Sequence, residues 1–141
     1  MSARRVFFLG NGPLAVDALA WLCDEGLPAT GCELVGMAVH PPATRRAGEA
    51  LLAHSGLGLG RVFLGDRLED PDVLEAIAAL KPDLGLSVMF GHILRPAFLE
   101  AFPRGVYNLH PALLPWNRGA HTNVWSILDG TPAGATLHRI D

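Results

Sequence analysis

The sequence predicts an α/β protein with a three-layer α/β/α, Rossmann-like and mostly parallel sheet, and three observations lead to this fold class. Short apolar runs typical of strands buried on both faces alternate with stretches whose apolar residues have helical spacing. Glycine and proline turns separate these stretches and do not gather into a linker. With 141 residues, of which 50% are hydrophobic and 18% charged, the chain can bury a core, so residues 1–141 are expected to form a single domain.

The first βαβ unit is expected at the N-terminal end. The apolar run 6–9 predicts a strand rather than a signal peptide, the segment 10–13 a glycine turn, and the spacing over 14–23 a helix. A second strand follows at 33–39 and ends at His40, for which a solvated loop position is the commoner role and a cleft position the alternative. The turn could offer backbone N–H groups to an anion at a helix N-terminus, or could simply make a tight bend. It lacks the third glycine of a dinucleotide-binding fingerprint.

The remaining elements continue the alternation. The pattern predicts a short helix at 47–52, an edge strand at 61–64, a helix at 71–80, a strand at 83–88, a helix beginning at Pro96, a strand ending at His110, a helix at 121–128 and a strand at 133–140. Asp70 is the expected N-cap of the helix that begins with Pro71. Alternation of this kind places helices on both faces of a parallel sheet.

The strand that starts at Val106 carries the strongest candidate site. Asn108 and His110 are two residues apart, so in a strand their side chains project from the same face. Pro111 and Pro115 bracket the loop that follows and stiffen it. Open α/β sheets bind ligands beyond the carboxyl ends of their strands, where this pair is expected. The alternative is that the asparagine caps the loop and the histidine is a hydrogen-bonded surface group.

Composition narrows the classes of function. The net charge is −3 and the sequence has no basic cluster beyond Arg45 and Arg46, which argues against a nucleic-acid partner. The apolar runs are too short for a transmembrane helix, so no membrane partner is expected. Cys23 and Cys32 lack metal-ligand spacing and are too few for a disulfide framework. They indicate reduced thiols in a cytoplasmic protein without a metal site.

The segment 108–115, Asn-Leu-His-Pro-Ala-Leu-Leu-Pro, followed by Arg118 and Gly119, resembles the signature of the folate-dependent formyltransferases. This group includes glycinamide ribonucleotide transformylase, methionyl-tRNA formyltransferase and the sugar N-formyltransferases. The resemblance implies that 10-formyltetrahydrofolate is the co-substrate and gives its formyl group to an amine. It implies that Asn108 stabilises the negative charge on oxygen in the tetrahedral intermediate, and that His110 assists that oxygen or relays a proton.

The same resemblance assigns the binding loops. The folate would be held by Met89, Phe90, Gly91, His92, Ile93 and Leu94, with Ile93 and Leu94 as apolar walls. The amine substrate would meet Gly10, Asn11, Gly12, Arg118 and Gly119. His92 and His121 are further histidines near these segments, but a structural role is the more common one for each.

The chain departs from the family at its C-terminal end. The resemblance places a catalytic aspartate a few residues beyond Asp141, which itself matches a preceding, non-catalytic acid and is a poor substitute. The last strand and helix of the fold are also lacking. The chain could therefore be part of a longer protein, a short homologue, or a form that binds without catalysis. A sheet left short would expose an unpaired edge through which a homo-oligomer could form.

The expected activity is transfer of a formyl group to a small-molecule amine, such as an amino sugar nucleotide or another amino metabolite. Two other functions remain open: a catalytically silent folate- or nucleotide-binding module, and a hydrolase that passes the formyl group to water. A plain dinucleotide-binding domain is disfavoured, because the glycine pattern is incomplete and no acidic residue follows the second strand.

Overall fold

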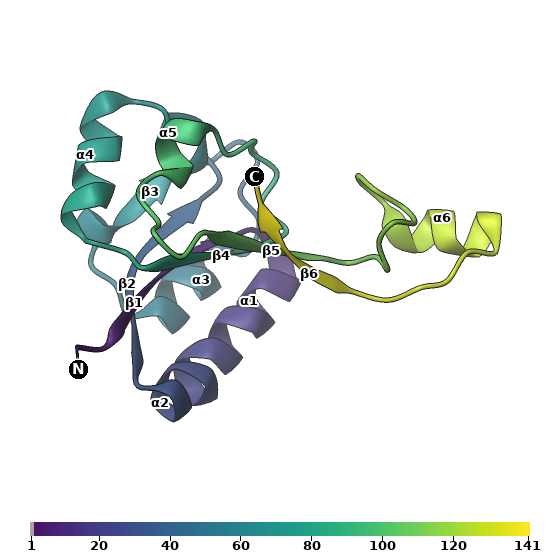
Figure 1. Ribbon diagram of the computed structural model, residues 1–141, viewed down its shortest axis with the longest axis horizontal. Coiled ribbons are helices and arrows are strands. Elements are labelled where there is room, and N and C mark those ends of the chain that lie inside the picture. The colour runs from purple at the N-terminus through teal and green to yellow at the C-terminus, as the bar shows by residue number, and fades with distance from the viewer. Residues whose placement is uncertain (1) are drawn as a thin grey trace.

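The computed structural model describes residues 2–141, and in this part of the chain six strands form a single sheet (Figure 1). The strands are β1 (Arg4–Gly10), β2 (Cys32–Val39), β3 (Val62–Leu64), β4 (Leu84–Val88), β5 (Val106–His110) and β6 (Thr136–Ile140). Their order in the sheet is β3-β2-β1-β4-β5-β6. The first five are parallel, and β6 runs antiparallel to β5. The predicted Rossmann-like α/β fold is confirmed.

Helices cover both faces of this sheet, as predicted. They are α1 (Gly12–Trp21), continued by a π turn (Leu22–Gly26) and α2 (Leu27–Thr30), then α3 (Gly48–Ser55), α4 (Pro71–Ala79), α5 (Pro96–Leu99) and α6 (Thr122–Asp129), with 3-10 turns η2 (Leu59–Arg61) and η3 (Gly65–Arg67). On one face, Val6 and Phe8 pack with residues of α1, α2 and α3. On the other, Phe7 and Leu9 pack with residues of α4 and α5. Consecutive residues of β1 thus serve two cores, which is why this strand is apolar throughout.

The topology places the site. The chain leaves β1 towards β2 and β3 on one side and then crosses to β4 and β5 on the other, so the strand order reverses between β1 and β4. Ligands of open α/β sheets bind beyond the carboxyl ends of the strands at such a reversal. The carboxyl ends of β1, β4 and β5 are Gly10, Val88 and His110.

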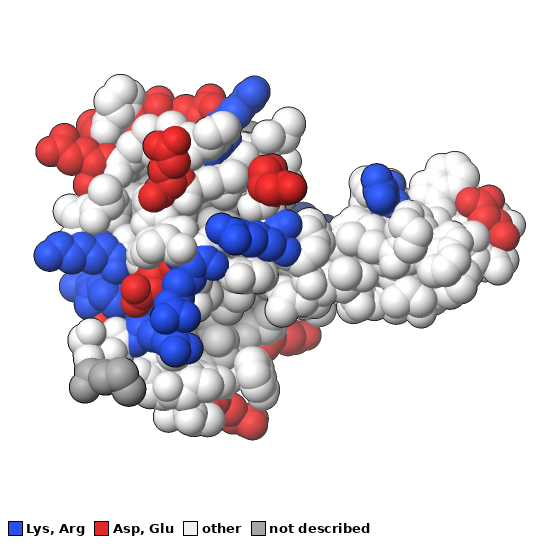
Figure 2. Space-filling view, in the orientation of Figure 1, with Lys and Arg blue, Asp and Glu red and all other residues white. Residues whose placement is uncertain are grey.

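Residues 111–135 form an arm that projects away from the sheet and its covering helices (Figure 1). Helix α6 lies in this arm, and the chain returns from it into β6. The strand predicted at 133–140 begins only at Thr136, because the preceding residues still belong to the arm. Arg118 and Asp129 are the only Lys, Arg, Asp or Glu residues of the arm, and its surface is largely uncharged (Figure 2).

Other expectations about local structure have mixed outcomes. Asp70 occupies the N-cap position of α4, but its side chain makes no capping hydrogen bond and instead pairs with Arg67 at 2.8 Å. Cys23 and Cys32 are free thiols, and burial raises the pKa of Cys23. Among the described residues no helix is both long and apolar enough to cross a membrane. Association through the edge strand β6 stays a prediction.

Candidate active site

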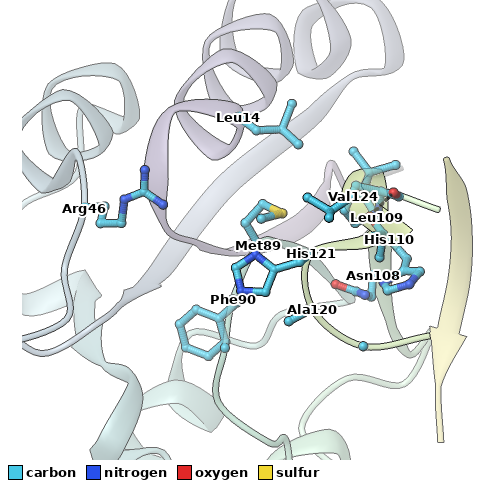
Figure 3. A pocket seen from close by; sticks show the side chains of 14 residues that line it. Leu14, Arg46, Met89, Phe90, Asn108, Leu109, His110, Ala120, His121 and Val124 are labelled. Carbon is cyan, nitrogen blue, oxygen red and sulfur yellow. Dashed lines mark hydrogen bonds between the residues drawn. The ribbon is translucent and has the colours of Figure 1, made fainter. Parts of the chain in front are cut away.

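A cavity of about 630 Å³ lies between the carboxyl ends of the strands and the base of the arm (Figure 3). Its volume is within the range of small-molecule sites. The sheet with its covering helices, called the body from here on, contributes four segments, and the arm contributes two. The lining residues are Leu14, Arg46, Met89, Phe90, Gly91, Asn108, Leu109 and His110 of the body, with Pro111, Gly119, Ala120, His121, Thr122 and Val124 of the arm. The predicted catalytic pair and part of the predicted folate loop therefore face one cavity.

Asn108 lies on β5 directly opposite His138 on β6, and the two side chains are in hydrogen-bond contact. Asn108 Nδ2 is 3.4 Å from His138 Nε2. An amide nitrogen only donates, so His138 Nε2 accepts. His138 Nδ1 donates to the carbonyl oxygen of Arg139 at 3.2 Å, which agrees with the same tautomer. The two contacts orient the amide of Asn108 and leave its second N–H for another acceptor.

His110 shares the face of Asn108 on β5, as the spacing predicts. Its Nε2 lies 3.1 Å from the carbonyl oxygen of Asn117 in the arm. A carbonyl oxygen only accepts, so Nε2 carries the proton. In the neutral imidazole the lone pair is then on Nδ1, the nitrogen that can take up a proton. His110 is thereby set up as a base rather than as a donor from Nε2.

His138 is the site residue that the sequence analysis missed as a functional residue. Its contact with Asn108 depends on the antiparallel register of β5 and β6, in which Asn108 pairs with His138 and His110 with Thr136. Alternation within residues 136–140 places Thr136 and His138 on one face of β6. This alternation is visible in the sequence, but it does not show which strand pairs with residues 136–140 or in which direction the two strands run.

Side-chain hydrogen bonds fasten the base of the arm to the sheet. Thr136 Oγ1 accepts the N–H of Leu114 at 3.0 Å and donates to the carbonyl of Ala112 at 2.7 Å. Thr122 Oγ1 donates to the carbonyl of Pro111. These bonds hold the segment after β5 beside Asn108 and His110, so the arm's lining residues have a defined position at the cavity.

The predicted folate loop divides into two parts. Met89, Phe90 and Gly91 line the cavity, and Met89 has a left-handed backbone with φ of 55° directly after β4. His92, Ile93 and Leu94 are not among the lining residues. Ile93 is 79% exposed and Leu94 packs against a body core, so neither forms a wall of this cavity.

The first glycine turn is used for internal bracing. The N–H of Asn11 donates to the carbonyl of Val88 at 3.3 Å, and that of Gly12 to the carbonyl of Arg46 at 3.0 Å. The side chain of Asn11 donates to the carbonyl of Thr44 and accepts the N–H of Arg46. Of the two alternatives for this turn, the contacts favour the tight bend, because neither of these two N–H groups is available to an anion. Gly10, Asn11 and Gly12 are absent from the described lining.

Two predictions about single residues need correction or completion. His40 is only 8% exposed, so the commoner role of a solvated loop histidine is wrong for it. Gly119 lines the cavity, whereas Arg118 is exposed and outside the lining. Arg46 and Leu14 line the cavity without having been predicted; Leu14 lies in the first turn of α1, and Arg46 lies between β2 and α3.

The lining suits a flat, largely apolar molecule with a few polar groups. Met89 and Phe90 offer apolar surface on one side, and the polar pair Asn108 and His110 lies on another (Figure 3). These residues fit a folate, because its ring can rest on apolar side chains while its reacting group meets the polar pair. No cluster of three His, Cys, Asp or Glu side chains that could hold a metal occurs among the residues described.

Comparison with known proteins identifies the family. A sequence profile described as Formyl transferase matches residues 6–141. The chain belongs to the formyl transferase family. Methionyl-tRNA formyltransferase of Chloroflexus aggregans is 40% identical over 149 aligned positions, covering 97% of this chain and 45% of that protein. The same enzyme of Trichlorobacter lovleyi is 34% identical and is covered to 45%, with 100% of this chain aligned.

Solved formyltransferase structures share the fold. Phosphoribosylglycinamide formyltransferase of Brucella melitensis superposes with a TM-score of 0.75 at 23% identity, over 97% of this chain and 72% of that one. A sugar N-formyltransferase from Shewanella gives 0.66 at 19% identity, over 98% and 51%. At such identities the likeness concerns the fold alone. The chain spans about 45% of the length of the first curated relatives it matches.

Proposed function

We propose that this chain carries the formyl-transfer site of a folate-dependent formyltransferase. The observation that carries the proposal is the cavity at the end of β5, where Asn108 and His110 lie on one face and His138 orients the amide of Asn108. Family membership supports the reaction class. When bound, 10-formyltetrahydrofolate supplies a formyl group that the amine acceptor can attack.

Asn108 is proposed to stabilise the charge that develops on the formyl oxygen. One N–H of its amide is occupied by His138 Nε2, and the second is available to that oxygen. A preorganised donor is effective here because it does not have to reorient when the charge appears. In mutagenesis of comparable donors, loss of one costs on the order of 10²–10³ in rate.

His110 is proposed to accept the proton that the attacking amine loses. Its Nε2–H is held by the carbonyl of Asn117, so the neutral ring offers Nδ1 as the proton acceptor. The resemblance left two roles open for this residue, donation to the oxygen and proton relay. The contact with Asn117 favours proton relay. The arm would then contribute to catalysis, since its Asn117 fixes the tautomer of His110.

Met89, Phe90 and Gly91 are proposed to bind the folate, with Phe90 and Met89 providing apolar contact. His92, Ile93 and Leu94 would act by shaping the loop outside the cavity. Gly119 remains a proposed contact of the acceptor, joined by Arg46, whose guanidinium is the one Lys or Arg side chain among the described lining residues. Arg46 suits an acceptor that carries negative charge near its amine.

For the acceptor, the α-amino group of methionyl-tRNA is the first candidate. The curated relatives at 34–40% identity are named methionyl-tRNA formyltransferases. They give no support to the amino sugar nucleotide expected from the sequence, and they argue against dismissing a nucleic-acid partner on net charge alone. Net charge describes the whole surface, and Arg46 places a positive charge at the cavity itself.

The test is to supply 10-formyltetrahydrofolate with methionyl-tRNA, with an amino sugar nucleotide, or with water alone, and to follow tetrahydrofolate and formyl product. The proposal predicts tetrahydrofolate release that depends on an amine and gives a stoichiometric amount of formylated amine. Formate release without an amine would indicate a hydrolase. Saturable folate binding without release under any condition would indicate a silent binding module.

The resemblance places a catalytic acid beyond Asp141, so the same assay is also applied to a longer version of the chain. The assay is repeated on a version extended at its C-terminus by the corresponding segment of a curated relative. Activity in the extended version alone would show that the chain holds the site but needs that segment. Activity in both would show that the added segment is not required.

A further inference from the structure

His40 is a buried histidine that joins the folate loop to the loop after β2, away from Asn108 and His110. It follows the last residue of β2 and is 8% exposed. Its Nε2 accepts the backbone N–H of Gly91 at 3.0 Å, across 51 residues of sequence. Gly91 lines the cavity next to Met89 and Phe90. One side-chain nitrogen thus fixes the backbone of the loop in its middle.

The partners of the ring determine its tautomer. A backbone N–H only donates, so Nε2 must hold a lone pair, and in the neutral ring the proton is on Nδ1. Nδ1 lies 3.2 Å from Thr44 Oγ1, which can accept it. Asn11 Nδ2 is 3.3 Å from the same nitrogen, while Asn11 also binds the carbonyl of Thr44. The ring therefore links the folate loop to Thr44 in the loop after β2, and Thr44 is joined to the first turn through its carbonyl, which accepts from Asn11.

The surroundings of His40 favour the neutral ring. Phe90 and His92 pack against it edge-on, with ring centroids 5.2 and 4.6 Å away. Burial, and secondly the positive charge available to His92, lower the pKa of His40 below 6.5. Arg45 also contacts this residue, since its Nε donates to the carbonyl of His40 at 2.8 Å, and Asp66 lies on η3, whose Gly65 adjoins His92.

We propose that His40 is a positioning residue for the folate loop, holding Gly91 so that Met89 and Phe90 face the cavity. The proposal rests on the proposed function, since it assumes that this loop binds the folate. His40 touches no reacting group and acts only through the loop backbone. Protonation would convert Nε2 into a donor, and two donors cannot bond, so the contact with Gly91 would be lost.

The direction of the pH effect follows from the lowered pKa. Between the folded-state pKa and 6.5 the unfolded chain binds more protons at this residue than the folded chain does. The stabilising effect of His40 is therefore complete above pH 6.5 and is lost as the pH falls through the folded-state pKa. Folate affinity should weaken as the pH falls through the folded-state pKa, because protonation of the folded protein breaks the contact with Gly91 and releases the loop.

Three variants test the role. His40→Leu removes the acceptor, His40→Gln restores an acceptor oxygen that does not titrate in this range, and His54→Ala is the matched control because His54 is exposed on α3. At pH 8 we expect His40→Leu to raise the KM for 10-formyltetrahydrofolate about 2- to 10-fold, as loss of one hydrogen bond implies, with kcat nearly unchanged. His40→Gln should be close to wild type at pH 8.

The pH profile separates positioning from simple destabilisation. In the wild type and in His54→Ala the KM should rise as the pH falls below 6.5, and in His40→Gln this rise should be absent. The proposal is overturned if His40→Leu keeps the wild-type KM, or if the acid rise persists in His40→Gln.

Two readouts do not need turnover. In ¹⁵N spectra of the histidine side chains at pH 8, His40 Nε2 should have the shift of an unprotonated nitrogen, and a protonated Nε2 would overturn the proposal. The dissociation constant of tetrahydrofolate should rise in His40→Leu and recover in His40→Gln. If no amine is formylated but both readouts hold, the proposed function fails while the role of His40 stands.

Discussion

The body of the protein and its arm are built on opposite principles. In the body, strands and helices bury large side chains on both faces of the sheet, with Phe7, Phe8 and Phe98 at most 1% exposed. In the arm, α6 leaves Trp125 and Ile127 50% and 81% exposed. The arm is held by hydrogen bonds at its base, whereas the body is held by packing.

This difference shows how the site is assembled. The proposed donor, Asn108, and its orienting partner His138 are fixed by strand register, which the packed body enforces. The tautomer of His110 depends instead on Asn117, a residue of the arm. The proposed site therefore combines Asn108, which is held by strand pairing, with His110, whose tautomer depends on a polar contact from the arm.

The largest change in stability is expected when a large side chain is removed from the core of the body. Phe7 is fully buried and its ring meets those of Phe98 and Phe102 edge-on at 6.1 and 5.7 Å. Phe7→Ala should lower the free energy of unfolding by about 3–5 kcal/mol, enough to unfold much of a marginal domain. Urea denaturation measures it. A loss below ~1 kcal/mol would show that the body core is far looser than its packing indicates.

A smaller effect is expected at the junction of body and arm. Thr136→Val keeps the shape of the side chain but removes the hydroxyl that binds Leu114 N–H and Ala112 carbonyl. Leaving these groups without that partner should cost about 1–3 kcal/mol. Limited proteolysis should then cut residues 111–135 faster while the body stays protected. Equal acceleration across the chain would mean that arm and body unfold as one unit.

The next largest effect is expected on kcat, when Asn108 loses the residue that orients its amide. His138→Leu removes the acceptor of one amide N–H, a hydrogen bond worth about 0.5–1.5 kcal/mol, so we expect kcat to fall about 2- to 10-fold with little change in folate KM. Single-turnover kinetics measures it. His54→Ala serves as the control again, and an unchanged kcat in His138→Leu would remove His138 from the site.

The smallest effect is expected on the arm surface. Trp125 is 50% exposed on α6, and Trp125→Ala should change the free energy of unfolding by about 0.5 kcal/mol or less. The contrast with Phe7→Ala, measured under the same conditions, is the direct check of the two building principles. A loss of several kcal/mol would show that α6 is packed rather than exposed.

The sequence predicted the body well, because its pattern is local. Apolar runs and helical spacing placed the strands and helices within a few residues, and the i,i+2 spacing placed Asn108 and His110 together. The predictions that failed, and the residue role that was missed, depended on contacts between residues distant in sequence. The burial of His40 requires Gly91, the bracing role of Asn11 requires Thr44 and Arg46, and the role of His138 requires an antiparallel register that no local pattern specifies.

The arm was the least predictable region for a physical reason. Its helix was expected at 121–128 and is found at Thr122–Asp129, but its projection from the body is set by tertiary contacts and not by periodicity. Several of its apolar residues are exposed, among them Trp125 at 50% and Ile127 at 81%.

The central proposal is that Asn108 stabilises charge during formyl transfer. The most direct measurement is the single-turnover rate of formyl transfer from 10-formyltetrahydrofolate to an amine, in wild type and in Asn108→Ala, with circular dichroism to verify the fold. We predict a rate lower by on the order of 10²–10³ with the fold and the folate dissociation constant unchanged. Equal rates in the two proteins would contradict the proposal.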